Sequence, residues 1–224
     1  MADTYTLTLH NASSQPGLTF AVYTVAPVGN TAGQFPVAWL TKPLNEGNQV
    51  TFAWTLDYAV MFATQGGQAG TVWKESSTVD VKDTDAQLNS ALLDYQNNDY
   101  VFQHNAGAHP VKPGEVYINT SATVPPWTLD AGPSVGLAIS GGESGQTPTM
   151  APAIVGNSGP NLVHTFDLHP TYYIDAGNIV QGAMADLDTV TQYQQVTYGS
   201  GVFAAEWTLD KSNNWVEGPP PRNS

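Results

Sequence analysis

Residues 35–64, FPVAWLTKPLNEGNQVTFAWTLDYAVMFAT, contain the pattern that decides the fold. A period of two in apolar side chains is typical of a β-strand with one buried face. The positions that show it are Val50, Phe52, Trp54, Leu56 and Tyr58, with Thr, Ala and Asp between them. Residues 37–39 indicate a second short strand, and the polar segment 42–48 predicts a turn that makes the two a hairpin. So much aromatic surface needs further strands to cover it.

Similar alternating segments follow one another along the whole chain and are separated by Gly, Pro and Asn. They predict about a dozen strands with little or no helix, a pattern typical of a sandwich or barrel. Residues 87–95 also match helical spacing, and we favour a strand there. We therefore predict an all-β, antiparallel β-sandwich that forms one domain over residues 1–224.

Two segments rich in Gly and Pro interrupt this pattern. Residues 141–160, GGESGQTPTMAPAIVGNSGP, contain five Gly and three Pro and predict a long loop without regular structure. Residues 217–224, EGPPPRNS, predict a Pro-rich tail. The apolar centre of the loop, with Met150, Ile154 and Val155, is our predicted contact for self-assembly.

The composition restricts the classes of partner. Six Lys and Arg stand against 19 Asp and Glu, which gives an acidic chain of net charge −13, and the basic residues are scattered. Nucleic acid and insertion into membranes are therefore not expected. Cys is absent, so disulfides and thiolate metal sites are not available. The N-terminus MADTYTLTLHNAS resembles neither a Sec signal nor a transmembrane segment, and we expect a soluble protein, cytoplasmic or exported by a non-classical route.

Acidic and imidazole side chains give weak signals for a metal. Asp80, Asp83 and Asp85 in VDVKDTD could bind Ca²⁺, but the Gly and terminal Glu of an EF-hand loop are missing, so a solvated acidic loop is the favoured interpretation. Asp186 and Asp188 form a second weak candidate. The pairs His104/His109 and His164/His169 are each five residues apart and would point to opposite faces of a strand. We predict core or interface histidines and no cofactor.

No catalytic motif is recognisable. The Gly and Ser clusters at 141–146, 156–159 and 199–201 lack the Gly-x-Ser-x-Gly spacing of a nucleophile elbow. A carboxylate pair for glycoside hydrolysis depends on the fold and not on spacing, so a hydrolase stays open as a third hypothesis.

Aromatic residues close to amides are candidate sugar-binding groups, because ring stacking and amide hydrogen bonds recognise carbohydrates. The candidates are Trp73, Tyr95, Tyr100, Tyr193 and Trp215. Sandwich cores and protein interfaces use the same residues. The sequence Trp-Thr-Leu-Asp also occurs three times, at 54–57, 127–130 and 207–210. We interpret it as convergence on a strand with Trp and Leu facing inward and not as a repeat.

With these segments in view, the chain resembles the RhiA-like family. The likeness lies in VAWLTKP, VTFAWTLDYAVMF, SVGLAISG and HPTYYIDAGNIVQG, in that order. The resemblance implies a compact, abundant β-protein without an assigned reaction, and it lends no catalytic residue. Our first hypothesis is a non-enzymatic protein that self-assembles into a homo-oligomer or fibre. The alternative is a carbohydrate-binding, lectin-like module with glycans as partners.

Overall fold

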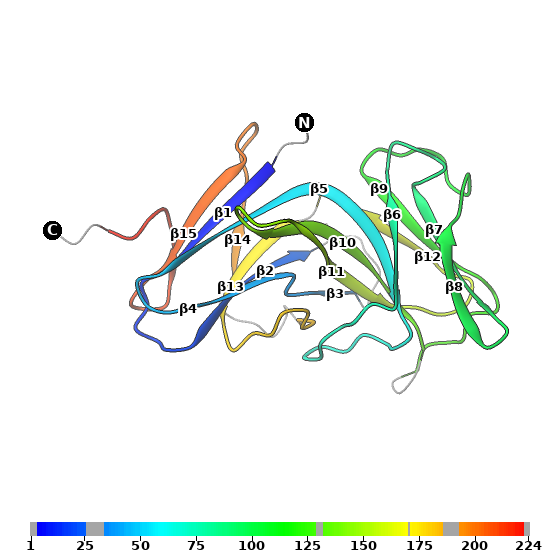
Figure 1. Cartoon of the computed structure of the whole chain (residues 1–224), viewed down its shortest axis with the longest axis horizontal. Helices are drawn as coiled ribbons and strands as arrows, with labels where there is room; N and C mark the ends of the chain where they lie inside the picture. Colours follow the sequence, from blue (N-terminus) through cyan, green and yellow to red (C-terminus); the bar gives the residue numbers. More distant parts are fainter. Residues whose placement is uncertain (1–3, 26–33, 129–131, 170, 186–192, 222–224) are drawn as a thin grey trace.

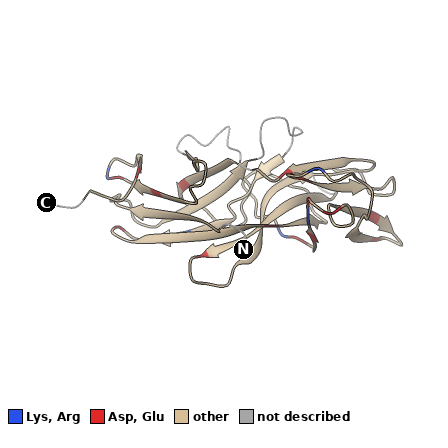
Figure 2. Cartoon of the chain, turned by 90° about the horizontal axis from the view of Figure 1, so that it is seen from above, with Lys and Arg blue, Asp and Glu red and all other residues tan. Residues whose placement is uncertain are grey.

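The computed structural model describes residues 4–25, 34–128, 132–169, 171–185 and 193–221. These residues form sixteen strands and no helix, so none of them belongs to a helix that could cross a membrane. Most strand pairs are antiparallel, and the predicted all-β fold is confirmed. Figure 2 shows the few Lys and Arg at separate places, while Asp and Glu are spread along the molecule.

The strands form one long sheet and two smaller sheets (Figure 1). The long sheet has the order β16-β15-β1-β5-β10-β11-β3, and β6 pairs with β5. Its strands are β1 (Thr4–Asn11), β3 (Gln34–Pro36), β5 (Gln49–Ala63), β6 (Ser77–Val81), β10 (Ser134–Glu143), β11 (Thr149–Asn157), β15 (Ala204–Leu209) and β16 (Trp215–Glu217). Strand β15, late in the chain, pairs in parallel with β1, the first strand of the described residues.

Each smaller sheet has four strands. The β2 sheet has the order β14-β13-β2-β4, with β2 (Leu18–Val25), β4 (Leu40–Leu44), β13 (Thr171–Gly177) and β14 (Gln194–Val196). The β9 sheet has the order β12-β9-β7-β8, with β7 (Ser90–Gln96), β8 (Asp99–His104), β9 (Glu115–Thr120) and β12 (Val163–Asp167). The strand predicted over 87–95 is therefore confirmed by β7.

Strand β5 of the long sheet packs against both smaller sheets. It arches across the molecule in Figure 1, and its fifteen residues supply side chains to two cores. Phe52 and Trp54 pack against the β2 sheet, whereas Val60 and Phe62 pack against the β9 sheet. The intervening Met61 belongs to a third cluster on the opposite face of the strand. The layered packing agrees with the predicted sandwich.

The predicted inward position of Leu56 is wrong, because β5 bulges there. Tyr58 pairs with Ile139 and Trp54 with Gly141, so residues 55–57 stand opposite the single residue Ser140. Extra residues on one strand bend it and disrupt the ladder locally. Leu56 is 42% exposed as a result, while Trp54 is fully buried.

The predicted hairpin over residues 37–58 is also wrong. Strand β4 pairs with β2, while the partners of β5 among the described strands are β1, β6 and β10. Leu40 and Leu44 of β4 face Phe52 across the core instead of lying beside it. The connection 45–48 therefore joins two layers of the fold. The aromatic side chains of β5 are covered by a strand of the facing sheet and not by a hairpin partner in the same sheet.

Residues 141–160 are not the predicted long loop. They contain the end of β10 and all of β11, which pair as a hairpin around the short connection 144–148. Pro152 is tolerated because the register shifts beside it, where a missing N–H costs little in hydrogen bonding. Gly141 is required because a Cβ there would lie 2.8 Å from Cζ3 of the buried Trp39. Gly141 and Pro152, which usually interrupt strands, therefore lie within β10 and β11.

Candidate functional site

A large pocket lies where the loop after β5 meets Trp127. We call it the Trp127 pocket; it has a volume of about 640 Å³. Its lining includes Phe35, Gln65, Gln68, Trp73, Trp127 and Asn157. This size is within the range of about 300–1,000 Å³ that is usual for ligand sites.

The loop that forms one wall, residues 64–73, is fixed by hydrogen bonds to the long sheet. The Asn157 side chain accepts from the Gly67 amide and donates to the Gly67 carbonyl at 3.0 Å, so it acts like a neighbouring strand. The Trp73 indole donates to Ser134 Oγ at 2.7 Å, and that hydroxyl donates to the Gln65 carbonyl. A loop held at both ends in this way presents its side chains without a large ordering cost.

Trp127 lines the same pocket beside this loop and is 38% exposed. It follows Pro125 and Pro126, which interrupt regular pairing. Its indole lies so close to Gly66 that a Cβ on that glycine would be 2.1 Å from Nε1. The absence of a side chain at Gly66 therefore allows the ring to approach the loop, and part of the ring stays open to the solvent.

The pocket combines aromatic surface with amides and carries few charges. Phe35 is partly buried, whereas Gln65 and Gln68 are exposed. Lys74 is the one charged side chain among the residues that line it. An aromatic face beside amide donors and acceptors suits a neutral ligand with an apolar face and several hydroxyls.

Of the predicted sugar-binding residues, only Trp73 lies at this pocket. It is 4% exposed and its indole N–H is used by Ser134, so it supports the floor and offers no free ring face. Its predicted role in stacking is therefore wrong. The sequence did contain a signal for Trp127, because a Trp after two prolines is unlikely to continue a buried strand, but it was not among our predicted residues.

The other predicted aromatic residues lie apart from each other. Tyr95 packs against Tyr100, with centroids 4.9 Å apart, and Tyr100 also contacts Phe62 of the core. Tyr193 meets the edge of Tyr173, and Trp215 meets the edge of Phe20. These four residues make aromatic contacts at three separate places, and the structure does not bring them together in one site.

The predicted assembly contact is wrong for two of its three residues. Ile154 is 2% exposed and Val155 is fully buried, because both belong to β11 and face opposite cores. Met150 is partly buried and packs against the third cluster. A partner could not reach Ile154 or Val155 without unfolding the sheet.

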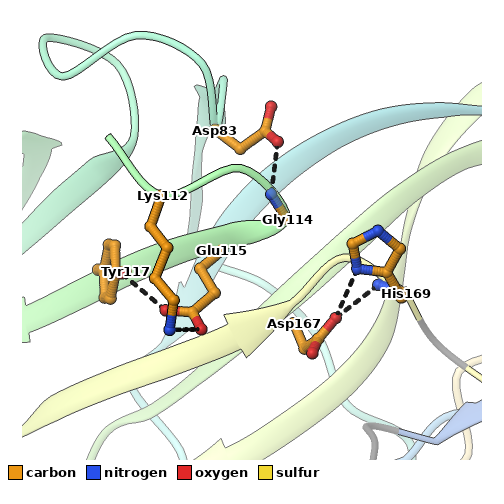
Figure 3. Close-up of polar contacts among 7 residues, drawn as sticks. All are labelled: Asp83, Lys112, Gly114, Glu115, Tyr117, Asp167 and His169. Carbon is orange, nitrogen blue, oxygen red and sulfur yellow. Dashed lines mark hydrogen bonds and ion pairs between the residues drawn. The ribbon is translucent and has the colours of Figure 1, made fainter. Parts of the chain in front are cut away.

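A polar cluster lies where the loops before β7 and β9 meet the end of β12 (Figure 3). Glu115 is paired with Lys112 and accepts a hydrogen bond from the Tyr117 hydroxyl at 2.8 Å. The Lys112 and Tyr117 hydrogen bonds hold the pKa of Glu115 below its usual value. Burial, followed by the bond to Glu115, raises the pKa of Tyr117 to about 12. These groups stabilise each other's ordinary protonation states.

The candidate calcium ligands have other partners. Asp83 accepts from the Gly114 amide at 2.7 Å, as Figure 3 shows, and Asp85 accepts from the Gln87 amide. Asp80 lies on β6. The described part of the chain holds no group of three or more carboxylate or imidazole side chains suited to a metal. Asp186 and Asp188 lie outside the described residues.

One Ser–His pair has the geometry of a nucleophile and a base but lies in the core. Ser158 Oγ is 2.8 Å from His164 Nε2, and the two residues are 2% and 8% exposed. Burial lowers the pKa of His164 to about 4, so the imidazole is neutral at pH 7. This agrees with the prediction of a core histidine. Substrate access to such a pair would need an opening, and neither residue lines a described pocket.

The fold is all-β, and the Trp127 pocket is lined by one charged side chain, Lys74. The RhiA family model matches residues 2–217, and the chain belongs to this family. It is 31% identical to Protein RhiA of Rhizobium leguminosarum bv. viciae, over 96% of this chain and 86% of the relative. The suggested family resemblance is therefore confirmed. No solved structure matches significantly.

Proposed function

We propose that the protein is a non-enzymatic carbohydrate-binding protein and that the Trp127 pocket is its binding site. The observation that carries the proposal is the partly exposed indole of Trp127 beside a loop that is fixed in place and bears Gln65 and Gln68. The apolar face of a pyranose ring would stack on the indole. The two glutamines would bind its hydroxyls, since each amide both donates and accepts.

The charge of the site supports a neutral glycan over an acidic one. Lys74 is the one basic side chain of the pocket, and the chain as a whole carries a net charge of −13. A long-range field of this sign repels anions. The proposal that the protein is not an enzyme is supported by Asp83 and Glu115, each of which is engaged in a hydrogen bond or ion pair of the fold.

A glycan array followed by calorimetry with the best glycan tests the proposal. We expect Trp127→Ala to weaken binding by about tenfold or more, because it removes the stacking surface. Gln68→Ala should also weaken it, whereas Gln103→Ala, which removes an exposed amide from β8, should not. Thermal melting would show that the variants fold. Binding of no glycan, or equal binding by Trp127→Ala, would reject the function.

Self-association is a second candidate function, now through β12 instead of β11. Strand β12 is an outer strand of the β9 sheet, and Val163 on it is 57% exposed. The Leu168 amide donates to Gly114 and the Leu162 carbonyl accepts from Thr120, so the alternate backbone groups of Val163 and Thr165 face away from β9. An exposed sheet edge is a template for pairing with a second copy.

Light scattering over a range of protein concentrations tests this second function. We expect oligomers or fibres that are lost in Val163→Lys and kept in Val202→Lys, which places the same charge at a 49% exposed valine outside the strands. The mass of a single chain at every concentration would reject assembly. Carbohydrate binding would be unaffected by that result.

A further inference from the structure

A second cavity lies at the bulge of β5, where β13 and β14 of the β2 sheet and residues 168–169 line it. It has a volume of about 290 Å³, and we call it the tyrosine cleft. Its apolar wall is formed by Tyr5, Leu56, Tyr172, Val196 and Tyr198, and His169 lies at its rim. The volume is at the lower end of the range for ligand sites, about 300 Å³, and so suits a single ring.

The bulge of β5 gives this cleft an exposed apolar side chain. Leu56 is 42% exposed although it stands between the buried Trp54 and the half-buried Tyr58 in a strand that otherwise faces the core. Leaving a leucine in water forfeits part of the free energy that its burial would contribute. A ring placed against Leu56 would recover part of that free energy. Bulges occur often beside binding sites because they redirect a side chain in this way.

The tyrosines form a wall of rings that meet edge to face. Tyr198 contacts Tyr5 at a centroid distance of 5.1 Å and Tyr172 at 6.0 Å, with interplanar angles of 84° and 87°. The Tyr172 hydroxyl accepts a hydrogen bond from the Trp54 indole at 3.1 Å, which fixes the ring. Aromatic rings favour this arrangement, and a further ring can extend it.

His169 is held in position although its side chain is 78% exposed. Its Nδ1 is 3.0 Å from Asp167 Oδ1, as Figure 3 shows. The imidazole also lies against Gly114, where a Cβ would be 2.4 Å from Cε1. A carboxylate at Nδ1 selects the tautomer with its proton on that nitrogen. In that tautomer the other nitrogen, Nε2, is a hydrogen-bond acceptor, and His169 is one of the residues that line the cleft.

We propose that the tyrosine cleft binds a small, neutral, monocyclic aromatic alcohol. The ring packs against Leu56 and the tyrosines, and the hydroxyl donates to His169 Nε2. Charge disfavours aromatic acids, because the carboxylate of Asp167 lies beside His169 of the cleft. Together with the net charge of −13, this carboxylate disfavours an anionic ligand.

Fluorine NMR with 4-fluorophenol and 4-fluorobenzoate tests the site. We expect a saturable shift of 4-fluorophenol, and weaker binding of 4-fluorobenzoate. Leu56→Ser and His169→Ala should each weaken phenol binding about fivefold. Val216→Ser, which alters a 49% exposed valine on β16, should leave it unchanged, and circular dichroism would show that each variant folds.

Three results would overturn the proposal. The first is no saturable shift of 4-fluorophenol, and the second is equal affinity in folded Leu56→Ser. Binding of 4-fluorobenzoate as tight as that of the phenol would reject the neutral class of ligand. None of these results bears on glycan binding, because the tyrosine cleft and the Trp127 pocket share no lining residue.

Discussion

Acidification should destabilise the fold through His164, and a variant at this position can isolate the effect. Burial lowers the pKa of the imidazole from 6.5 to about 4 in the folded protein. Between these values the unfolded chain binds a proton that the folded protein does not, so stability falls as the pH falls from 6.5 toward 4. The full shift corresponds to about 3.4 kcal/mol at about 1.36 kcal/mol per unit of pKa. Between about pH 7.5 and pH 4.5, the expected loss is about 2.5 kcal/mol.

Urea unfolding followed by tryptophan fluorescence measures this loss. His164→Gln keeps a polar group near Ser158 but has no titratable proton, so its free energy of unfolding should change less with pH by about 2.5 kcal/mol. His104→Gln removes an exposed imidazole on β8 and serves as the matched control. Acidic groups with lowered pKa values, such as Asp94, affect stability mainly below this pH range. Their contributions are the same in wild type and variant and therefore cancel when the two pH profiles are compared. Parallel pH profiles for wild type and His164→Gln would refute the reasoning.

Two further predictions concern the strands that replace the expected loop. Gly141→Ala should destabilise the fold by about 1–3 kcal/mol, because the new Cβ would lie 2.8 Å from the Trp39 ring and 3.1 Å from Trp54 Cβ. Gly142→Ala is the control, since its nearest neighbours would be 3.9 Å away, and equal urea midpoints for the two variants would contradict the packing argument. Ile154→Asp should prevent folding, because it buries an unpaired charge at a position that is 2% exposed. Val163→Asp at the exposed edge should not, and a cooperative thermal transition in Ile154→Asp would contradict the core position.

The sequence is sufficient to predict the strands whose two faces differ. In β5 and β1, apolar and polar side chains alternate, and the buried residues Leu7, Leu9, Phe52 and Trp54 follow from that alternation. The alternation of Val135, Leu137 and Ile139 indicates the first part of β10, but the sequence is not sufficient for its end and for β11, because Gly and Pro occupy positions within them. Packing against Trp39 and a register shift, which depend on distant residues, make those breakers acceptable.

The sequence was also not sufficient to predict which strands pair with each other. The turn at 42–48 was visible, but its residues do not determine whether the next strand lies beside β4 or across the core from it. Strand β4 pairs with β2, whose own alternation was already visible in the sequence. The Trp127 pocket was missed for a similar reason, because Gly66, Asn157 and Trp127 are distant in sequence and meet only in the fold.

The three Trp-Thr-Leu-Asp segments show that the burial of a side chain depends more on its neighbours in the fold than on the local sequence. Trp54 is fully buried between two sheets, whereas Trp127 is 38% exposed after two prolines. The leucines differ in the opposite sense: Leu56 is 42% exposed on a bulge, and Leu209 is 4% exposed in β15. A true duplication would be expected to keep the same residues inside, so the differing environments favour convergence. The two segments that depart from a regular strand, at Trp127 and at Leu56, are also the ones that line the proposed binding sites.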